Sequence, residues 1–345
     1  MRYALYSNSE HTWDAMLKSI RAARTSIYLE MYIFLSDTEP SHGFYQALAE
    51  RAQAGVTVKV IIDGFGSSDV PTKDLDILRA AGTEVLVFRE IFRRTHRKIL
   101  IVDEKVGFLG GVNIGKAYIG WLDLHVKVSG RTIVQSLVRS FASTYKKCGG
   151  RDKQLLDRTY RSPLKNAKLW LLEHTPMAGR NPLGIHYRER FKNAQSSIVI
   201  VSPYFLPHPW LVTELERALR RGVRVEVILP EKTDPALAAL GHRIFVQALA
   251  PLGANFYFTR TMLHAKALVI DSVEATVGSQ NIDALSFDYN LEAGMLFTRK
   301  DMIRDLLRIL DSWKKDARLF DPLTDPPRWY DSFIALGVWL LQPVL

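Results

Sequence analysis

The sequence predicts an α/β protein made of two copies of one unit, and three observations support this. The 345-residue chain is 47 % hydrophobic, enough for a sizeable core and too apolar for a disordered protein. Strand-like apolar runs alternate with amphipathic helical stretches, as in sheets layered with helices. A histidine–lysine motif occurs at His96 and again at His264. We therefore expect two duplicated α/β/α sandwich halves, related by a pseudo-twofold axis, with mixed and largely parallel sheets.

The predicted elements follow the same order in both copies. A strand begins with "SIYLEMYIF" at Ser26 and another with "SIVIVSPYF" at Ser197, each after an amphipathic helical stretch. A second helix ends at Gly55 or at Gly222, because glycine adopts the left-handed conformation that often follows a helix. A strand rich in β-branched residues comes next, and a third helix and strand precede the motif. This shared order indicates a duplication.

The repeat also predicts the domain boundaries. The region between the copies is basic and interrupted by glycine and proline, which is typical of a link. A helical stretch, a turn-rich segment and an apolar tail follow the second copy. We divide the chain into a first half at 1–148, a link at 149–168, a second half at 169–300, and a C-terminal helix with an apolar tail at 301–345.

Charge and cysteine content limit the class of protein. The chain has 46 Lys and Arg against 36 Asp and Glu, a formal net charge of +10. Such a surface favours nucleic acid or acidic lipid as a partner without choosing between them. A single cysteine, Cys148, excludes an intrachain disulfide and a cysteine-based zinc site. We expect neither a signal peptide nor a transmembrane helix, since no apolar run is long enough.

The repeated motif carries the chemistry. "THRKILIVDEKVGFLGGVN" starts at Thr95 and "LHAKALVIDSVEATVGSQN" at Leu263. Residues two apart on a strand face the same side, so each histidine lies beside a lysine that offers a fixed positive charge. Neutral imidazole can act as nucleophile or base, and small residues let backbone amides approach an oxyanion. The candidates are His96, Lys98, Asp103, Gly111 and Asn113 in the first copy, and His264, Lys266, Asp271, Ser279 and Asn281 in the second.

Two copies would form one shared active site between the halves. One imidazole can attack phosphorus while the other, protonated, gives its proton to the leaving alkoxide, and this scheme needs no metal or other cofactor. Asp123 and Glu292 lie on the strand after each motif, where a carboxylate can accept the imidazole Nδ1–H. The sequence leaves open whether each carboxylate serves its own half or the other.

Two further residues are weaker candidates. His125 lies two residues after Asp123 on the same strand face. Glu30 could be an acid of the pocket, although its counterpart Val201 is apolar.

The motifs and their surroundings resemble the phospholipase D superfamily. "LEMYIF", "FRRTHRKILIVD", "VSPYFLP", "RALRRGVRVEVILPEKTD" and "TVGSQNIDALSFDYNLEA" are similar to bacterial cardiolipin synthases, in particular the shorter type without an N-terminal transmembrane hairpin. The likeness covers roughly residues 1–300. Leu285 stands before Ser286 where many members have arginine, which we interpret as a marker of the subtype.

The resemblance implies two phospholipase D-like halves and a phosphatidyltransferase that makes cardiolipin from phosphatidylglycerol and a second phospholipid such as phosphatidylethanolamine. It implies a phosphohistidine at His96, acid and base catalysis by His264, and structural support from Asp103 and Asp271. The implied phosphate ligands are Lys98, Lys266, Asn113 and Asn281. It also implies a peripheral protein on the cytoplasmic side of the bacterial cytoplasmic membrane, bound to an anionic lipid surface.

Several alternatives remain open. A phosphodiesterase of the same superfamily would hydrolyse phospholipid or nucleic acid, with nucleic acid the less favoured partner. The basic run Arg93, Arg94, Arg97 and Lys98 is either a solvated cluster or a binding site for phosphates. The apolar tail from Arg328 is either a terminal helix that docks on the core or an interfacial helix. The sequence does not indicate the oligomeric state.

Overall fold

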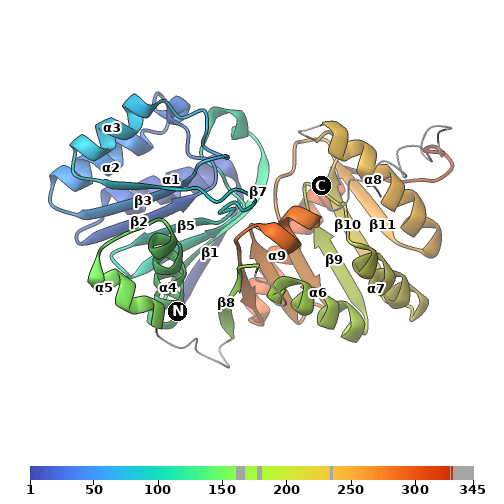
Figure 1. Cartoon of the computed structure of the whole chain (residues 1–345). Helices are drawn as coiled ribbons and strands as arrows, with labels where there is room; N and C mark the ends of the chain where they lie inside the picture. The colour runs from blue at the N-terminus through green and yellow to red at the C-terminus, as the bar shows by residue number, and fades with distance from the viewer. Residues whose placement is uncertain (161–167, 177–180, 234–235, 327, 329–345) are drawn as a thin grey trace.

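Each half of the sequence forms one mixed β-sheet with helices on both faces (Figure 1). The structure is a computed structural model that describes residues 1–160, 168–176, 181–233, 236–326 and 328. The elements follow one another in the same order in both halves, which confirms the predicted duplication.

The first sheet has seven strands, and its last three in spatial order are parallel. In spatial order the strands are β1 (Arg2–Asn8), β7 (Leu122–Ser129), β6 (Val106–Gly110), β5 (Lys98–Val102), β2 (Ser26–Met31), β3 (Thr57–Asp63) and β4 (Glu84–Phe88).

The second sheet has eight strands and repeats this arrangement, with one further strand at the edge. In spatial order the strands are β15 (Ala317–Leu319), β11 (Asn255–Thr259), β10 (Arg224–Pro230), β9 (Ser197–Val201), β12 (Ala267–Ile270), β13 (Glu274–Gly278), β14 (Glu292–Phe297) and β8 (Leu169–His174).

The sheets are mixed, as predicted, but the expectation that they are largely parallel is wrong. Only β2–β3–β4 and β9–β10–β11 pair in parallel, and the other pairs are antiparallel. The reason is the motif strand, β5 or β12, after which the chain reverses twice. Asp103 and Asp271, with φ of 53° and 52°, occupy the tight turns of the first reversal.

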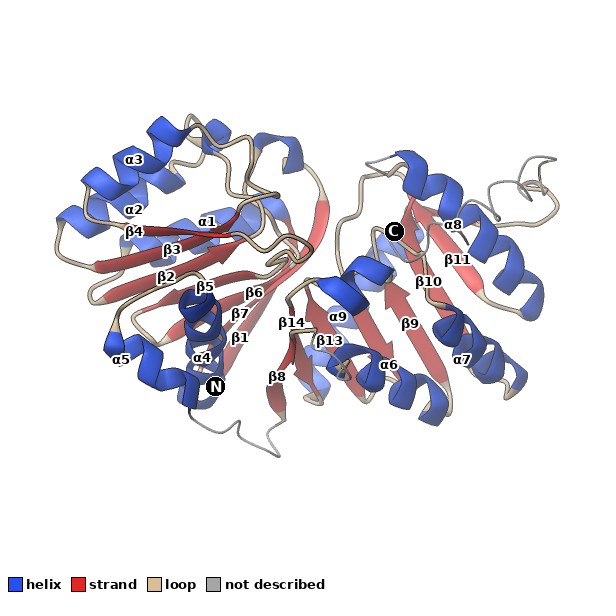
Figure 2. Ribbon diagram, viewed as in Figure 1, coloured by secondary structure: helices blue, strands red, loops and turns tan. Residues whose placement is uncertain are grey.

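Helices cover the outer and inner faces of both sheets (Figure 2). Gly55 and Gly222, with φ of 85° and 83°, follow the second helix of each half, as predicted. The outer helices are α1 (Ser9–Arg21), α2 (Phe44–Gln53) and α3 (Thr72–Ala80), and α6 (Pro182–Asn193), α7 (Pro209–Arg220) and α8 (Ala236–Leu249). The inner helices are α4 (Arg131–Lys147) and α9 (Lys300–Lys315), with the short α5 (Lys153–Leu156) beside α4.

One hydrophobic core is shared by the two halves. On α4, Ile133, Leu137 and Phe141 recur every four residues and so face one side of the helix, where they are buried. They belong to a cluster that also contains Leu306 and Leu310 of α9 and residues of both sheets. The sheets meet through β6 and β7 on one side and β13 and β14 on the other. This contact fixes the two motif strands relative to each other.

The segment that we set apart at 301–345 begins as part of the second half. Helix α9 packs on β11, and β15 pairs with β11 through Tyr257 and Leu319. None of the described helices is both long and apolar enough to cross a membrane. The two interpretations of the apolar tail concern residues beyond Arg328, which lie outside the described part of the chain.

Candidate active site

Backbone hydrogen bonds between the halves hold both motif histidines. The amide of His96 donates to the carbonyl of Leu291 at 3.0 Å, and the amide of His264 donates to that of Leu122 at 2.7 Å. In return, the amide of Leu291 donates to Arg94 and that of Leu122 to Met262. Each histidine is therefore positioned by a strand of the other half.

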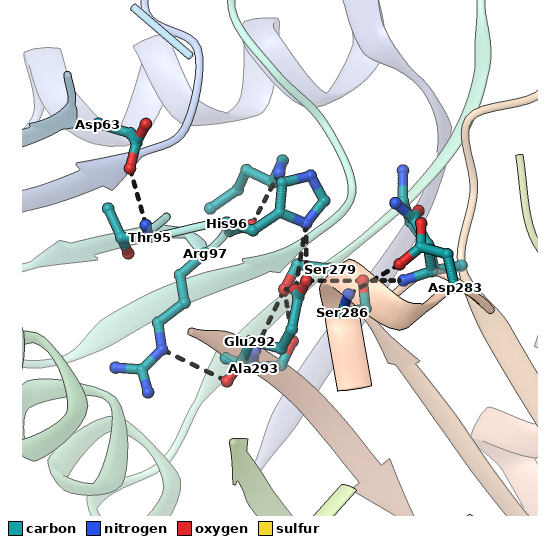
Figure 3. A network of polar contacts seen from close by, with 12 residues as sticks. Asp63, Thr95, His96, Arg97, Ser279, Asp283, Ser286, Glu292 and Ala293 are labelled. Carbon is teal, nitrogen blue, oxygen red and sulfur yellow. Dashed lines mark hydrogen bonds and ion pairs between the residues drawn. The ribbon is translucent and has the colours of Figure 1, made fainter. Parts of the chain in front are cut away.

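The orienting carboxylates are exchanged between the halves. Nδ1 of His96 lies 3.0 Å from Oε1 of Glu292, and Nδ1 of His264 lies 2.8 Å from Oδ2 of Asp123. Figure 3 shows the first of these contacts. This answers the question that the sequence left open. A carboxylate on Nδ1 favours the tautomer with its proton there, which leaves Nε2 with a lone pair.

His96 is neutral near pH 7 and its partner is ionised. Burial lowers the pKa of His96 to about 4. Burial alone would raise the pKa of Glu292, but the interactions with His96, Lys98 and the hydroxyl of Ser279 bring it down to about 2. In the described part of the chain, no protein hydrogen bond reaches Nε2 of His96. The geometry and charge thus leave this nitrogen free to act as a nucleophile.

Two serine hydroxyls complete the shell of Glu292. Ser279, one of the predicted residues, donates to Oε2, and Ser286 donates to Oε1 at 2.9 Å. Ser286 also accepts the backbone amide of Asn281 at 2.9 Å, and its own amide donates to Asp283 (Figure 3). Sequence reasoning named Ser286 only as the residue after Leu285, which it interpreted as the subtype marker, and gave Ser286 no role. Its place five residues after the motif asparagine was the available signal.

The second histidine has a different environment. Nζ of Lys266 lies 2.7 Å from Nε2 of His264. Burial, followed by the charges of Lys266 and Lys98, lowers the pKa of His264 well below its usual range. Burial raises the pKa of Asp123 to about 6 and lowers that of Lys266 to about 8. The lone pair of His264 therefore already accepts a proton donor, unlike that of His96.

The two lysines lie beside their histidines, as strand alternation predicts. Nζ of Lys98 donates to the carbonyl of His96 at 2.7 Å, and Nζ of Lys266 donates to that of His264 at 2.5 Å. Both side chains are buried, and burial lowers the pKa of Lys98 well below its usual range. Two buried lysines in one site attract an anion, and a bound anion in turn favours the charged form of both.

The small residues after each motif differ between the copies. A Cβ on Gly111 would lie 2.2 Å from Oδ1 of Asp123, so only glycine leaves room for this carboxylate. Ser279 occupies the equivalent position and donates its hydroxyl to Glu292. The amides of Gly111 and Ser279 are both bonded to strand carbonyls, so the structure does not leave them pointing at a ligand.

The two motif asparagines are buried after β6 and β13. Asn113 is 2 % exposed and Asn281 is 6 % exposed. In the described residues, the Oδ1 atom of each has no protein partner. Buried polar atoms are usually satisfied, so each of these oxygens is available to accept a hydrogen bond from a donor group of a ligand, such as a hydroxyl.

The motif aspartates Asp103 and Asp271 lie at the far ends of β5 and β12, away from the histidines. Each carboxylate accepts the backbone amides at the start of a neighbouring strand. These donors outweigh burial and lower the pKa of both groups. The donating amides are those of Arg24, Thr25 and Ser26 for Asp103, and Gln195, Ser196 and Ser197 for Asp271.

Aromatic rings line the site, and sequence reasoning missed them. The ring centre of Tyr32 lies 4.7 Å from that of His96, with Nζ of Lys98 4.9 Å from the tyrosine ring. Trp121 and Tyr118 lie 5.9 Å and 6.1 Å from His264. Burial raises the pKa of Tyr32 to about 12, so it stays neutral. Nothing in a single sequence separates such rings from ordinary core aromatics.

Arg97, between the motif histidine and lysine, is buried and points away from the site. Its guanidinium donates to the hydroxyls of Ser140 and Thr144 on α4 and to the backbone carbonyls of Glu292 and His174 in the second half. Figure 3 shows the contact with Glu292. The interpretation of the basic run as a solvated cluster is therefore wrong for Arg97 and Lys98, which are 1 % and 0 % exposed.

The two weaker candidates lie close to the site without touching a motif histidine. Glu30 accepts the hydroxyl of Thr95, and burial raises its pKa. His125 is buried beside Gly110, and burial lowers its pKa to about 3. Neither ring nitrogen of His125 has a protein partner in the described residues.

Comparisons with known proteins agree with this arrangement. The family profile described as "Cardiolipin synthase, PLD-like domain" matches residues 16–145 and 187–313, once in each half. A probable cardiolipin synthase of Bacillus subtilis (strain 168) is 32 % identical over 336 residues, which cover 92 % of this chain and 66 % of that protein. The cardiolipin synthase of Geobacillus kaustophilus (strain HTA426) is 29 % identical over 365 residues, covering 99 % of this chain and 72 % of that protein.

A solved structure shares the fold. The phosphatidylserine synthase of Haemophilus influenzae Rd KW20 superposes with a TM-score of 0.80, covering 99 % of this chain and 95 % of that chain at 16 % identity. The chain spans just under two thirds of the length of its Bacillus subtilis relative. With one family match on each half and a phospholipase D fold throughout, this chain belongs to the family of cardiolipin synthases with phospholipase D-like domains.

Proposed function

We propose that the protein is a phosphatidyltransferase that makes cardiolipin from phosphatidylglycerol and a second phospholipid. The observation that carries this proposal is the exchange of Glu292 and Asp123 between the halves. It supports one composite site in which two oriented imidazoles and two buried lysines surround one phosphodiester. Its relatives, named as cardiolipin synthases, support the choice of lipid substrate.

The first step forms a phosphohistidine. Nε2 of His96 attacks the phosphorus of the donor lipid, an N–P bond forms, and the P–O bond to the departing head-group alcohol breaks. The alcohol oxygen takes a proton from Nε2 of His264. Lys98 and Lys266 balance the charge on the non-bridging oxygens, and the amides of Asn113 and Asn281 bind them.

His264 must carry a proton in this step although burial and the lysines lower its pKa in the free protein. The bound phosphodiester resolves this, because its negative charge offsets Lys98 and Lys266 and so raises the pKa of His264. The phosphate replaces Nε2 of His264, 2.7 Å from Nζ of Lys266 in the free protein, as the partner of this lysine, which keeps its proton. His264 takes its own proton from solvent.

The second step reverses the roles. The free hydroxyl of a second phosphatidylglycerol gives its proton to neutral His264 and attacks the phosphorus. The N–P bond breaks, cardiolipin leaves, and His96 returns to its neutral form. The aromatic walls around the two histidines favour a lipid alcohol over water in this step.

The test is incubation of the purified protein with phosphatidylglycerol vesicles, with and without phosphatidylethanolamine, followed by mass spectrometry of the lipids. Cardiolipin with released glycerol or ethanolamine supports the transferase and identifies the donor. Phosphatidic acid alone would mean hydrolysis, and the absence of any lipid product would contradict the proposal. The exposed His11 offers a matched control, because His11→Ala should leave the product yield unchanged.

A further inference from the structure

The connection that leads to the first motif histidine is longer than its counterpart in the second half. Residues 89–95 join β4 to His96, whereas residues 260–263 join β11 to His264. Strands β4 and β11 have equal lengths, and each pairs in parallel with the preceding strand, although β11 also pairs with β15. The shorter connection in the second half shows that this fold can join the strand to the motif histidine without the additional residues of the first half. The additional residues therefore need another explanation.

The extra residues form an exposed apolar tip. In the loop at 89–94, Ile91 is 85 % exposed and Phe92 is 78 % exposed. Phe65, in the loop that follows β3, is 63 % exposed beside them. Large apolar side chains that are exposed together are not stabilised by packing within the fold. They usually mark a surface that a membrane or another protein covers.

Arginines surround this tip. Arg89 is exposed, Arg93 lies 3.4 Å from Glu90, and the guanidinium of Arg94 stacks over the ring of Phe65 at 4.3 Å. Arginine pairs well with phosphate groups, and basic residues close to an acidic leaflet are attracted to it. An apolar tip within a basic rim is complementary to the boundary between the acyl chains and the phosphate head groups of a bilayer.

The loop is joined rigidly to the site. The amide of Thr95, directly after it, donates to Oδ2 of Asp63 at 2.8 Å, and the amide of His96 is bonded to Leu291. A depression of about 290 Å³ lies between the loop and the end of β3. Figure 2 shows β4 ending on the side of the first half that faces the second. A surface that binds this loop would therefore lie at a fixed position relative to His96.

We propose that the loop at 89–94 docks the protein on an anionic bilayer. Ile91 and Phe92 insert below the head groups, while Arg89, Arg93 and Arg94 contact lipid phosphates. This inference rests on the proposed function, since it explains how a site for phospholipid meets its substrate. The basic rim favours a bilayer over a protein partner as the occupant.

The test compares the full chain carrying Ile91→Ser and Phe92→Ser with a matched control, Val273→Ser. Val273 is 62 % exposed in the turn between β12 and β13, away from the site. We expect the loop variant to need about tenfold or more phosphatidylglycerol vesicles for half-maximal sedimentation, since two buried apolar side chains are lost. The control should bind like the wild type. Equal binding of the loop variant and the wild type would overturn the inference.

A second measurement separates this inference from the proposed function. Transfer is assayed with vesicles and with a short-chain phosphatidylglycerol below its critical micelle concentration. The loop variant should lose activity on vesicles and keep it on the dispersed substrate, because the site itself is unchanged. A wild type inactive on both substrates would contradict the proposed function, while sedimentation would still decide the docking. A loop variant with full activity on vesicles would contradict the docking alone.

A site-specific probe identifies what covers the tip. Phe92→Cys, labelled with an environment-sensitive fluorophore in a Cys148→Ser background, should shift its emission to the blue with phosphatidylglycerol vesicles and stay unchanged with phosphatidylcholine vesicles. The same label at Val273→Cys should not respond. If the protein is bound to vesicles but the emission of the label at position 92 remains that of a label in water, the proposal is overturned in favour of a protein partner.

Discussion

The two motif histidines share a sequence pattern but differ at Nε2. Among the described residues, no hydrogen bond reaches Nε2 of His96, whereas Nε2 of His264 lies 2.7 Å from Nζ of Lys266. Their orienting partners also differ, since Glu292 accepts two serine hydroxyls, and the described part of the chain provides no such hydroxyl to Asp123. These contacts support the proposed roles of His96 as nucleophile and His264 as acid, which the symmetric motifs alone do not distinguish.

This assignment predicts different responses to the leaving group. With phosphatidyl-p-nitrophenol, whose leaving group needs no proton, His264→Ala should still release a burst of nitrophenolate. His96→Ala should release none, because it cannot form the intermediate. With phosphatidylglycerol, both variants should lose turnover by about 1,000-fold or more. The measurement is stopped-flow absorbance, and a burst from His96→Ala with none from His264→Ala would reverse the two roles.

The titratable groups of the site predict a bell-shaped dependence of kcat/KM on pH. The pKa of Asp123 is about 6, so activity should fall as acid protonates the acceptor for His264. The pKa of Lys266 is about 8, so activity should fall at higher pH as this phosphate ligand loses its charge. Neutral His96, with a pKa of about 4, contributes no limb in this range.

The pH profile has its own control. Lys266→Arg keeps a cation at high pH and should remove or shift the alkaline limb, even if its overall rate is lower. An alkaline limb that is unchanged in this variant would show that Lys266 is not the group responsible.

At the scale of the elements, the turns after β5 and β12 explain why aspartate belongs to the motif. Asp103 and Asp271 each tie the backbone amides of a neighbouring strand to the end of the motif strand. Replacing either by alanine should destabilise the protein by about 1–2 kcal/mol, as loss of a capping carboxylate does, without changing the activity of the folded fraction. Urea denaturation with turnover per folded molecule measures this, and a normal stability with lost activity would indicate a direct role in the chemistry.

The sequence predicted the parts of this architecture that depend on local pattern. Strand alternation predicted His96 beside Lys98, and the repeated element order predicted two equivalent halves. The antiparallel orientation of β6 and β7 was missed, although no helix precedes either strand in the way that a parallel crossover requires. The exchange of Glu292 and Asp123 was not predictable, since it arises from pairing between segments that are far apart in the sequence.

Other features were not predicted because their residue types occur at surfaces, in cores and in sites alike. Arg97 lies in a basic run that suggests a surface, yet its neighbours on α4 and in the second half make it a buried link. Tyr32 directly follows β2 and Trp121 directly precedes β7, positions where core aromatics are also common. Burial of such residues depends on how the halves pack, which periodicity within one element does not report.

At the scale of the whole molecule, Arg97 joins the first half to the second. Arg97→Met keeps the aliphatic length but leaves the carbonyl of His174 and the hydroxyls of Ser140 and Thr144 without this donor. We expect a loss of about 3 kcal/mol or more in the free energy of unfolding, as for other broken buried networks. Lys105→Met, at an exposed position, serves as the control in the same urea titration. Equal free energies of unfolding for Arg97→Met and the control would show that the link through Arg97 contributes little.

The exchanged carboxylates make the two copies dependent on each other in inheritance. A change at Asp123 in the first copy removes the Nδ1 partner of the second copy's histidine, and a change at Glu292 removes that of the first copy's histidine. If the proposed function holds, neither copy can be lost or exchanged while the other keeps working, so selection acts on the two copies together.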